Sequence, residues 1–204
     1  MIHIIDYGAG NIGSIANMIR KAGGSSTVTS DIDTIETAEK LILPGVGHFD
    51  HGMRKLKESG LIDVLQKKVV QAKCPILGIC LGAQLMTKSS EEGTEKGLGW
   101  FDAEVKLFNK IEGDVNLRVP HMGWNYINAV KETPLSADLY EESRYYFVHS
   151  YYMEAYNRND ILFETVYGRT FVSGLNHENI YAVQFHPEKS HKFGLKLFQN
   201  FLKL

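Results

Sequence analysis

The stretch PILGICLGAQ, residues 75–84, constrains the fold more than any other part of the 204-residue sequence. Residues 76–79 are apolar and rich in β-formers, which indicates a short buried strand. Helix formers with apolar spacing follow, so Cys80 stands where a central strand turns sharply into a helix. This is a nucleophile elbow in its G-x-C-x-G form. Gly78 and Gly82 let the strand and the helix approach closely, and the helix N-terminus favours negative charge at the sulfur.

The elements predicted before the elbow alternate between strands and helices. This order predicts an α/β fold with a largely parallel central sheet and helices on both of its faces. From about residue 99 the chain is rich in strand signals, so the second half is expected to be antiparallel, followed by a closing helix over residues 190–204. With no repeat or linker, we expect one domain, residues 1–204. The predicted early strands are 2–6, 27–29 and 39–43, the early helices begin near 12, 49 and 61, and the later strands are 103–108, 145–153, 161–167, 170–175 and 180–185.

Composition excludes several classes of function. The net charge of −2 gives no basic field for nucleic acid or an anionic membrane. No apolar run approaches the roughly 20 residues of a membrane span, and the sequence begins with an apolar strand rather than a signal peptide. Cys74 and Cys80 flank a predicted strand about 20 Å long, too far apart for a disulfide. Free thiols indicate a cytoplasmic protein, and Cys74 is expected to be structural.

A catalytic thiol needs a base, and His186 is the best candidate among the 8 histidines. It follows the apolar strand 181–185 and precedes Pro187 and Glu188. In extended backbone, His-x-Glu places both side chains on the same side, so Glu188 can orient the imidazole of His186. His149 is the competing base, but it has no acidic residue nearby.

The other histidines give no metal prediction. His48 and His51 lie three residues apart, but no third ligand is evident, so we predict no metal. His3, His177 and His191 are expected at the surface.

Acyl transfer to a thiol also needs an oxyanion hole of backbone N–H groups. One donor is expected at Leu81, directly after the elbow. The second is expected from the glycine-containing turn at residues 44–47. Gln84 lies one helical turn beyond Cys80 and could bind a polar end of the substrate.

A glycine cluster near the N-terminus supports a rival function. Gly8, Gly10 and Gly13 match G-x-G-x-x-G after a strand, and Asp31 stands near the end of the next strand, as in dinucleotide-binding proteins. The same cluster could instead form a tight β–α turn or contact a partner protein. A cysteine peptidase with a similar elbow is a further alternative.

Taken together, residues 45–47, 78–82 and 186–188 resemble the class I (triad) glutamine amidotransferases. Four stretches are similar to the glutaminase subunits of imidazole glycerol phosphate synthase: IDYGAGN at 5–11, LPGVG at 43–47, PHMGWN at 120–125 and QFHPEKS at 184–190. The resemblance covers essentially the whole chain. It implies a three-layer α/β fold and hydrolysis of L-glutamine to L-glutamate and ammonia, without a cofactor.

The resemblance also implies residue roles. Cys80 would attack the glutamine amide, His186 would transfer protons and Glu188 would orient His186. Val46, Gly47 and Leu81 would form the oxyanion hole. The remaining implied roles are glutamine contacts at Gly47, Gln84, His149, Ser150 and Tyr151, and a partner-facing, ammonia-passing side at Asn11, His121, Met122, Trp124, Asn125 and Lys189.

The implied partner is a (βα)8-barrel cyclase, which would form a heterodimer with this chain and use the ammonia to make imidazole glycerol phosphate in histidine biosynthesis. Some similar proteins instead supply ammonia for amidino groups on surface sugars. The glutaminase residues are the same in both roles, and residues 131–158 carry no further motif beyond 149–151.

Overall fold

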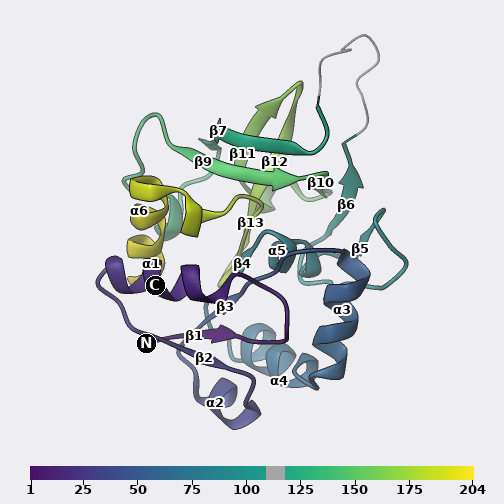
Figure 1. Ribbon diagram of the computed structural model, residues 1–204, viewed down its shortest axis with the longest axis vertical. Coiled ribbons are helices and arrows are strands. Elements are labelled where there is room, and N and C mark those ends of the chain that lie inside the picture. Colours follow the sequence, from purple (N-terminus) through teal and green to yellow (C-terminus); the bar gives the residue numbers. More distant parts are fainter. Residues whose placement is uncertain (109–117) are drawn as a thin grey trace.

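The structure, a computed structural model, describes residues 1–108 and 118–204 (Figure 1). An 11-stranded sheet runs through it in the order β2-β1-β3-β4-β13-β12-β10-β6-β5, with β11 paired to β12 and β8, while β7 and β9 form a separate two-stranded sheet. The strands are β1 (Ile2–Ile5), β2 (Ser26–Thr29), β3 (Lys40–Leu43), β4 (Ile76–Ile79), β5 (Ser89–Ser90), β6 (Ala103–Leu107), β7 (His121–Tyr126), β8 (Asn128–Ala129), β9 (Arg144–His149), β10 (Tyr151–Ala155), β11 (Ile161–Tyr167), β12 (Arg169–His177) and β13 (Ile180–Val183). The α-helices are α1 (Ile12–Lys21), α2 (Ile32–Thr37), α3 (Phe49–Glu58), α4 (Ile62–Leu65), α5 (Leu81–Leu85) and α6 (His191–Leu202).

The first half of the sheet is parallel, as the alternation of elements predicts. Strand β4 lies between β3 and β13 and is parallel to both, with Leu43 opposite Gly78 and Ile79 opposite Val183. Parallel strands end at the same edge of a sheet. The turn after β3, the elbow after β4 and the residues after β13 therefore meet at one place.

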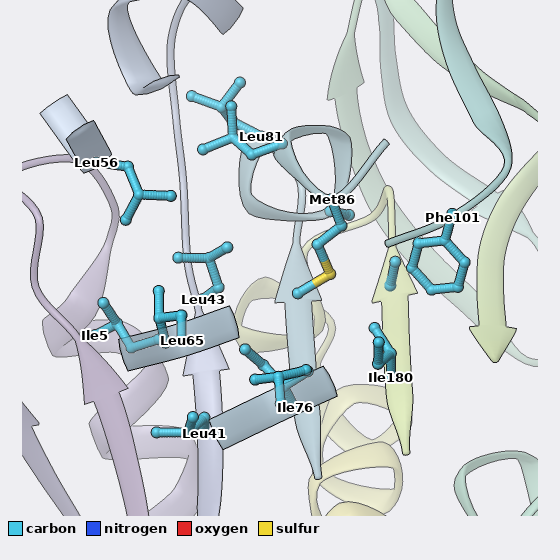
Figure 2. Close-up of a cluster of buried hydrophobic side chains, with 14 of the residues drawn as sticks. Ile5, Leu41, Leu43, Leu56, Leu65, Ile76, Leu81, Met86, Phe101 and Ile180 are labelled. Carbon is cyan, nitrogen blue, oxygen red and sulfur yellow. The ribbon is translucent and has the colours of Figure 1, made fainter. Parts of the chain in front are cut away.

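Both faces of this parallel region are buried, so its strands carry apolar residues on both sides. Ile42 and Leu77 belong to the core shared with α1 and α6, whereas Leu41, Leu43 and Ile76 belong to the core under α3 and α4. Figure 2 shows part of the second core, where Leu41, Leu43 and Ile76 lie close to Leu65 of α4. The predicted helical cover on both faces is confirmed (Figure 1).

The second half is antiparallel, but two details differ from the prediction. The strand predicted over 145–153 is two strands that separate at Ser150. Strand β9 pairs with β7, and β10 pairs with β6 and β12 in the main sheet. The chain changes sheets at Ser150, and a run of apolar residues contains no signal for such a change.

Two further differences lie in the helices. Helix α2 was not predicted, because its six residues bury only Ile35. The helix predicted from residue 61 begins at Ile62 but continues beyond Leu65 as a π-helical segment, Gln66–Gln71. Among the residues that the structure describes, no helix is both long and apolar enough to cross a membrane.

The elbow is built by close contacts that only glycine allows. Cys80 has φ 54° and ψ −115°, a strained backbone for a residue with a side chain. A Cβ atom at Gly82 would lie 2.0 Å from the Leu43 carbonyl oxygen, and one at Gly78 would lie 2.9 Å from the Ala83 Cα. The close approach predicted for these two glycines is confirmed, and it presses α5 against the end of β3.

We predict that Gly82→Ala destabilises the fold by about 1–3 kcal/mol, because the backbone of β3 has to move. Gly13→Ala is the matched control, since Gly13 is an exposed helical residue whose Cβ would meet nothing within 4 Å. That variant should be neutral or more stable by up to about 1 kcal/mol. Urea unfolding measures both, and equal stabilities would contradict the close contact at Gly82.

Candidate active site

The carboxyl edge of β3, β4 and β13 opens into a cavity of about 440 Å³. Most of the residues that line it come from the three strand ends, from α5 and from the break between β9 and β10, and two come from the segments that follow β5 and precede β7. They are Val46, Gly47, Cys80, Leu81, Gln84, Glu92, Pro120, Val148, His149, Ser150, Tyr151, His186 and Lys189. Many of the residues predicted for a site therefore surround one space.

Cys80 and His186 line this cavity, and Glu188 lies behind His186. The Nδ1 atom of His186 is 2.8 Å from Oε1 of Glu188, and both side chains are almost completely buried. A 3₁₀ turn, Pro187–Lys189, follows His186 and brings the carboxylate back to the ring. The His186 backbone is fixed by its N–H, which donates to the Tyr146 carbonyl at 2.9 Å, and by the Ser190 hydroxyl, which donates to its carbonyl at 2.6 Å.

The environment of His186 favours its protonated form. Burial lowers the pKa of His186, but the neighbouring Cys80 sulfur and Glu188 carboxylate outweigh burial and raise the pKa to about 9. The Nε2 atom is buried and has no hydrogen-bond partner among the described residues. Cys80 and Glu188 are thus the two neighbours that favour a proton on the His186 ring.

The turn after β3 supplies the third side of the cavity. Pro44 is held from behind, because the Tyr7 hydroxyl donates to its carbonyl at 2.7 Å. The backbone φ of Gly47 is +102°, a conformation that favours glycine at this position. Val46 beside it is 43% exposed. As the first residue of α5, Leu81 has a backbone N–H without an intrahelical acceptor. Val46, Gly47 and Leu81 thus line the same cavity.

Gln84 lines the cavity, and its predicted contact with a substrate stays a prediction. Its Nε2 donates to the Gln184 Oε1 at 2.9 Å and to the Tyr151 carbonyl at 3.3 Å. Gln184 in turn donates to the Cys80 sulfur at 3.9 Å. The amide nitrogen of Gln84 therefore supports the cavity wall.

Glu92 lines the cavity and was missed by the sequence analysis. Its Oε2 accepts a hydrogen bond of 2.8 Å from the Phe49 N–H, at the start of α3. The loop around it is fixed by Asp50, which accepts from the backbone N–H groups of Thr94 and Glu95, each at 2.9 Å. The sequence gives no signal for Glu92, because it belongs to a polar loop without periodicity.

His149 lines the cavity but is unsuited to be the base. Its Nδ1 is 2.7 Å from the Tyr151 carbonyl and its Nε2 is 3.0 Å from Nδ1 of His121. Burial lowers the pKa of His149 to about 3. Both ring nitrogens are thus engaged away from Cys80, so the structure favours His186.

The segment expected to face a partner is strand β7, and its side chains alternate. Met122 and Trp124 are 61% and 44% exposed, whereas His121 is buried at 2% and Asn125 turns inward to bond the Val166 carbonyl. Tyr126, at the end of the strand, is 52% exposed, so three large side chains of β7 are open to solvent.

Of the other two residues of that expected side, one lines the cavity. Lys189 lies there with its Nζ 5.8 Å from the centre of the Tyr146 ring, whereas Asn11 directly precedes α1.

The dinucleotide interpretation fails on geometry. A Cβ at Gly10 would lie 2.9 Å from the Pro44 side chain, so this loop packs on the turn beside the cavity. Gly13 packs on nothing, although the third glycine of the fingerprint should allow close helix–strand packing. Asp31 is the N-cap of α2 and accepts from the Thr34 N–H at 2.8 Å. The cluster is a tight β–α turn.

The remaining histidine and cysteine expectations have mixed outcomes. His48 caps α3 by accepting from the Asp50 N–H at 3.2 Å, and the described residues contain no group of three or more possible metal ligands. The surface prediction for His3 is wrong, because it is only 7% exposed. Cys74 is buried and points to the Ala38 carbonyl, 3.5 Å away.

Comparison with known proteins agrees with this geometry. The pattern of the family "Glutamine amidotransferase class-I" matches residues 3–204. The chain is 56% identical to the imidazole glycerol phosphate synthase subunit HisH 2 of Methanococcus maripaludis, covering 100% of this chain and 99% of that one, and 48% identical to the subunit of that name from Pseudomonas aeruginosa, covering 100% of both. A crystal structure of a glutamine amidotransferase has a TM-score of 0.77 at 18% identity, over 99% of this chain and 97% of that one, which shows the shared fold.

We predict that Glu188→Gln lowers the pKa of His186, because the imidazolium loses its carboxylate partner. NMR titration of the histidine rings measures this change. Asp160→Asn is the matched control, since Asp160 contacts His177 rather than His186. An unchanged His186 titration in Glu188→Gln would contradict the pairing.

The raised pKa of His186 also predicts how stability depends on pH. Between the ordinary value of 6.5 and about 9, the native state holds a proton that the unfolded state has released. The contribution of His186 to the free energy of unfolding is therefore present below pH 6.5 and is lost as the pH rises through about 9. Denaturant unfolding measures this loss. Between pH 6.5 and about 9, the free energy of unfolding should fall less in Glu188→Gln than in the unchanged protein.

Proposed function

The chain belongs to the class I glutamine amidotransferase family, and we propose that it hydrolyses L-glutamine at the cavity where Cys80 and His186 meet. The observation that supports this site best is the buried His186–Glu188 pair beside a strained cysteine at the elbow. A buried carboxylate fixes the ring, and the free Nε2 is left for proton transfer.

The reaction follows from these groups. The Cys80 sulfur attacks the side-chain amide carbon of glutamine, and the carbonyl oxygen becomes an oxyanion. His186 gives a proton to the departing nitrogen, so ammonia leaves and a γ-glutamyl thioester remains on Cys80. His186 then takes a proton from water, whose oxygen attacks the thioester and releases glutamate and the thiol. Glu188 stabilises the imidazolium at each stage.

The oxyanion would be held by backbone N–H groups. Leu81 supplies one, from the first turn of α5, where the helix dipole also favours negative charge. The peptide of Val46 and Gly47 supplies the second from the facing turn. Gly47 has no side chain to obstruct the approach of the amide.

The polar ends of glutamine also have candidate partners. The carboxylate of Glu92 lines the cavity and suits the α-ammonium group. The backbone of Gly47, Ser150 and Tyr151 forms the remaining polar wall, which Gln84 supports from behind.

We further propose that the chain is the glutaminase subunit of an imidazole glycerol phosphate synthase and forms a heterodimer with a (βα)8-barrel cyclase in the cytoplasm. The names of the full-length relatives support this, as do the exposed Met122 and Trp124 on β7. Asn11 and Lys189 belong to the same proposed side, where ammonia would pass to the cyclase for histidine biosynthesis. Supply of ammonia to a sugar-modifying enzyme would use the same glutaminase site.

We predict that Cys80→Ala lowers the rate of glutamine hydrolysis by roughly three orders of magnitude or more, because the thioester cannot form. A glutamine-analogue electrophile should label Cys80 alone. Cys74→Ala is the matched control and should keep both activity and labelling, since Cys74 lies outside the cavity. Hydrolysis by Cys80→Ala at a rate close to that of the unchanged protein, or labelling at Cys74, would exclude the assignment.

We predict that the cyclase raises glutaminase activity, since the Val46–Gly47 turn is exposed until a partner covers it. Trp124→Ala should weaken the complex, as measured by calorimetry. Val28→Ala, on the edge strand β2 and also 44% exposed, should leave it unchanged. Equal affinity in both variants would remove β7 from the interface.

A further inference from the structure

Two buried histidines contact one another between the paired strands β7 and β9. The proposed reaction uses neither of them. His121 and His149 are cross-strand partners of β7 and β9, and the Nδ1 of His121 is 3.0 Å from the Nε2 of His149. They are 2% and 6% exposed. Their surroundings are aromatic: His121 stacks between Phe147 and Tyr167, with ring centres 4.8 and 4.0 Å away. Buried rings of this kind have to satisfy each hydrogen-bonding atom with a definite partner.

The two ends of this contact determine where the protons lie. At one end, the Tyr151 carbonyl can only accept, so the Nδ1 of His149 carries a proton and donates to it at 2.7 Å. At the other end, the Nδ2 of Asn125 lies 3.2 Å from the Nε2 of His121. The Asn125 amide is itself oriented by two backbone groups, because its Oδ1 accepts from the Tyr126 N–H and its Nδ2 donates to the Val166 carbonyl.

Only one arrangement of neutral rings satisfies both ends. The Nε2 of His121 has to accept from Asn125, so the proton of His121 is on Nδ1. That N–H donates to the Nε2 of His149, whose proton is on Nδ1. The hydrogen bonds then run in one direction, from Asn125 through both rings to the Tyr151 carbonyl.

A charged ring would break this order. A proton added to His149 at Nε2 would face the N–H of His121, and one added to His121 at Nε2 would face the Asn125 amide. Burial accordingly lowers the pKa of His121 to about 4 and that of His149 to about 3. The pair is therefore neutral wherever the enzyme works near neutral pH.

The acceptor at the end of the relay belongs to the cavity wall. Tyr151 is the first residue after the break between β9 and β10, and Ser150 and Tyr151 both line the cavity. The same carbonyl accepts from Gln84, and Gln84 bonds Gln184, which donates to the Cys80 sulfur. The polar contacts thus continue from β7 to the nucleophile.

We propose that His121 and His149 are positioning residues, both held as neutral Nδ1–H tautomers, that fix the Tyr151 carbonyl and with it the Ser150–Tyr151 wall where glutamine binds. The expected effect on glutamine binding rests on the proposed glutaminase function. The orientation of the wall is set from β7, whose opposite face carries Met122 and Trp124. At the break, the Ser150 carbonyl accepts from the Phe108 N–H at 2.9 Å, whereas the Tyr151 carbonyl accepts from the side chains of His149 and Gln84.

The tautomers can be read directly from the full chain. In ¹⁵N NMR of the histidine rings at neutral pH, His121 and His149 should each show a protonated Nδ1 and an unprotonated Nε2. The exposed His51 is the internal reference and should show the mixture of tautomers that is typical of a solvated ring. An Nε2–H tautomer at either buried histidine would overturn the proposal.

The positioning role is tested by glutamine affinity, measured by NMR titration in a Cys80→Ala background so that no turnover occurs. His149→Phe fits the aromatic surroundings but cannot donate to Tyr151, and it should weaken glutamine binding by roughly two- to tenfold. His149→Asn keeps an amide N–H near the Nδ1 position and should restore most of the affinity. His177→Gln, at an exposed histidine, is the matched control and should change nothing.

The outcomes separate the two proposals. In the Cys80→Ala background, the positioning role would be overturned by equal glutamine affinity with and without His149→Phe, or by the absence of rescue in His149→Asn. Either result would leave the proposed glutaminase function standing. If the unchanged protein, with Cys80 in place, neither binds nor hydrolyses glutamine with or without the cyclase, the proposed function fails. This holds whatever tautomers the two rings show.

Discussion

The register of three parallel strands determines where the chemistry of this chain can occur. Leu43 of β3 lies opposite Gly78 of β4, and Ile79 of β4 lies opposite Val183 of β13. The three strands therefore end side by side at one edge of the sheet. The glycine-rich turn after β3, the thiol after β4 and the imidazole after β13 meet there. A slip of one residue in either pairing would turn the elbow toward the opposite face of the sheet. The different side chains on the two faces of β4 oppose that slip, because a shift by one residue would exchange the side chains of two well-packed cores.

The sequence was sufficient for the parts of the site that obey local rules. The elbow at Cys80, the His186–Glu188 spacing and the glycine turn each combine a residue type with a strand end, and strand ends are predictable from apolar runs. Glu92 and the relay of His121 and His149 were not predictable in this way. Glu92 reaches the cavity from an irregular loop that Asp50 holds, and the two histidines meet only because β9 leaves the main sheet to pair with β7. Those contacts depend on tertiary placement, which no short sequence window contains.

The interior beside the cavity is unusually polar for a region so deeply buried. Gln84, Gln184 and His149 are all nearly inaccessible to solvent, yet each has a hydrogen-bond partner. A half-satisfied network in a low-dielectric interior is costly, so each member depends on the others being present. The network keeps the cavity wall rigid around the proposed substrate, which has polar groups at both ends. Two exceptions lie in the His186–Glu188 pair, where Nε2 of His186 and Oε2 of Glu188 have no partner among the described residues. In the proposed reaction, Nε2 is the atom that moves a proton.

The turn at Pro44 and Gly45 is enclosed between two glycines from separate elements. A side chain at Gly10 would touch Pro44 at 2.9 Å, and one at Gly45 would lie 2.6 Å from the Gly82 backbone nitrogen. The loop before α1, the turn and the elbow therefore share one packing space, although 72 residues separate Gly10 from Gly82 along the chain. A change of shape in any one of these segments therefore displaces the other two. Remodelling the first glycine loop to fit a different partner would also move the turn, so the surface around that loop and the shape of the cavity would change together.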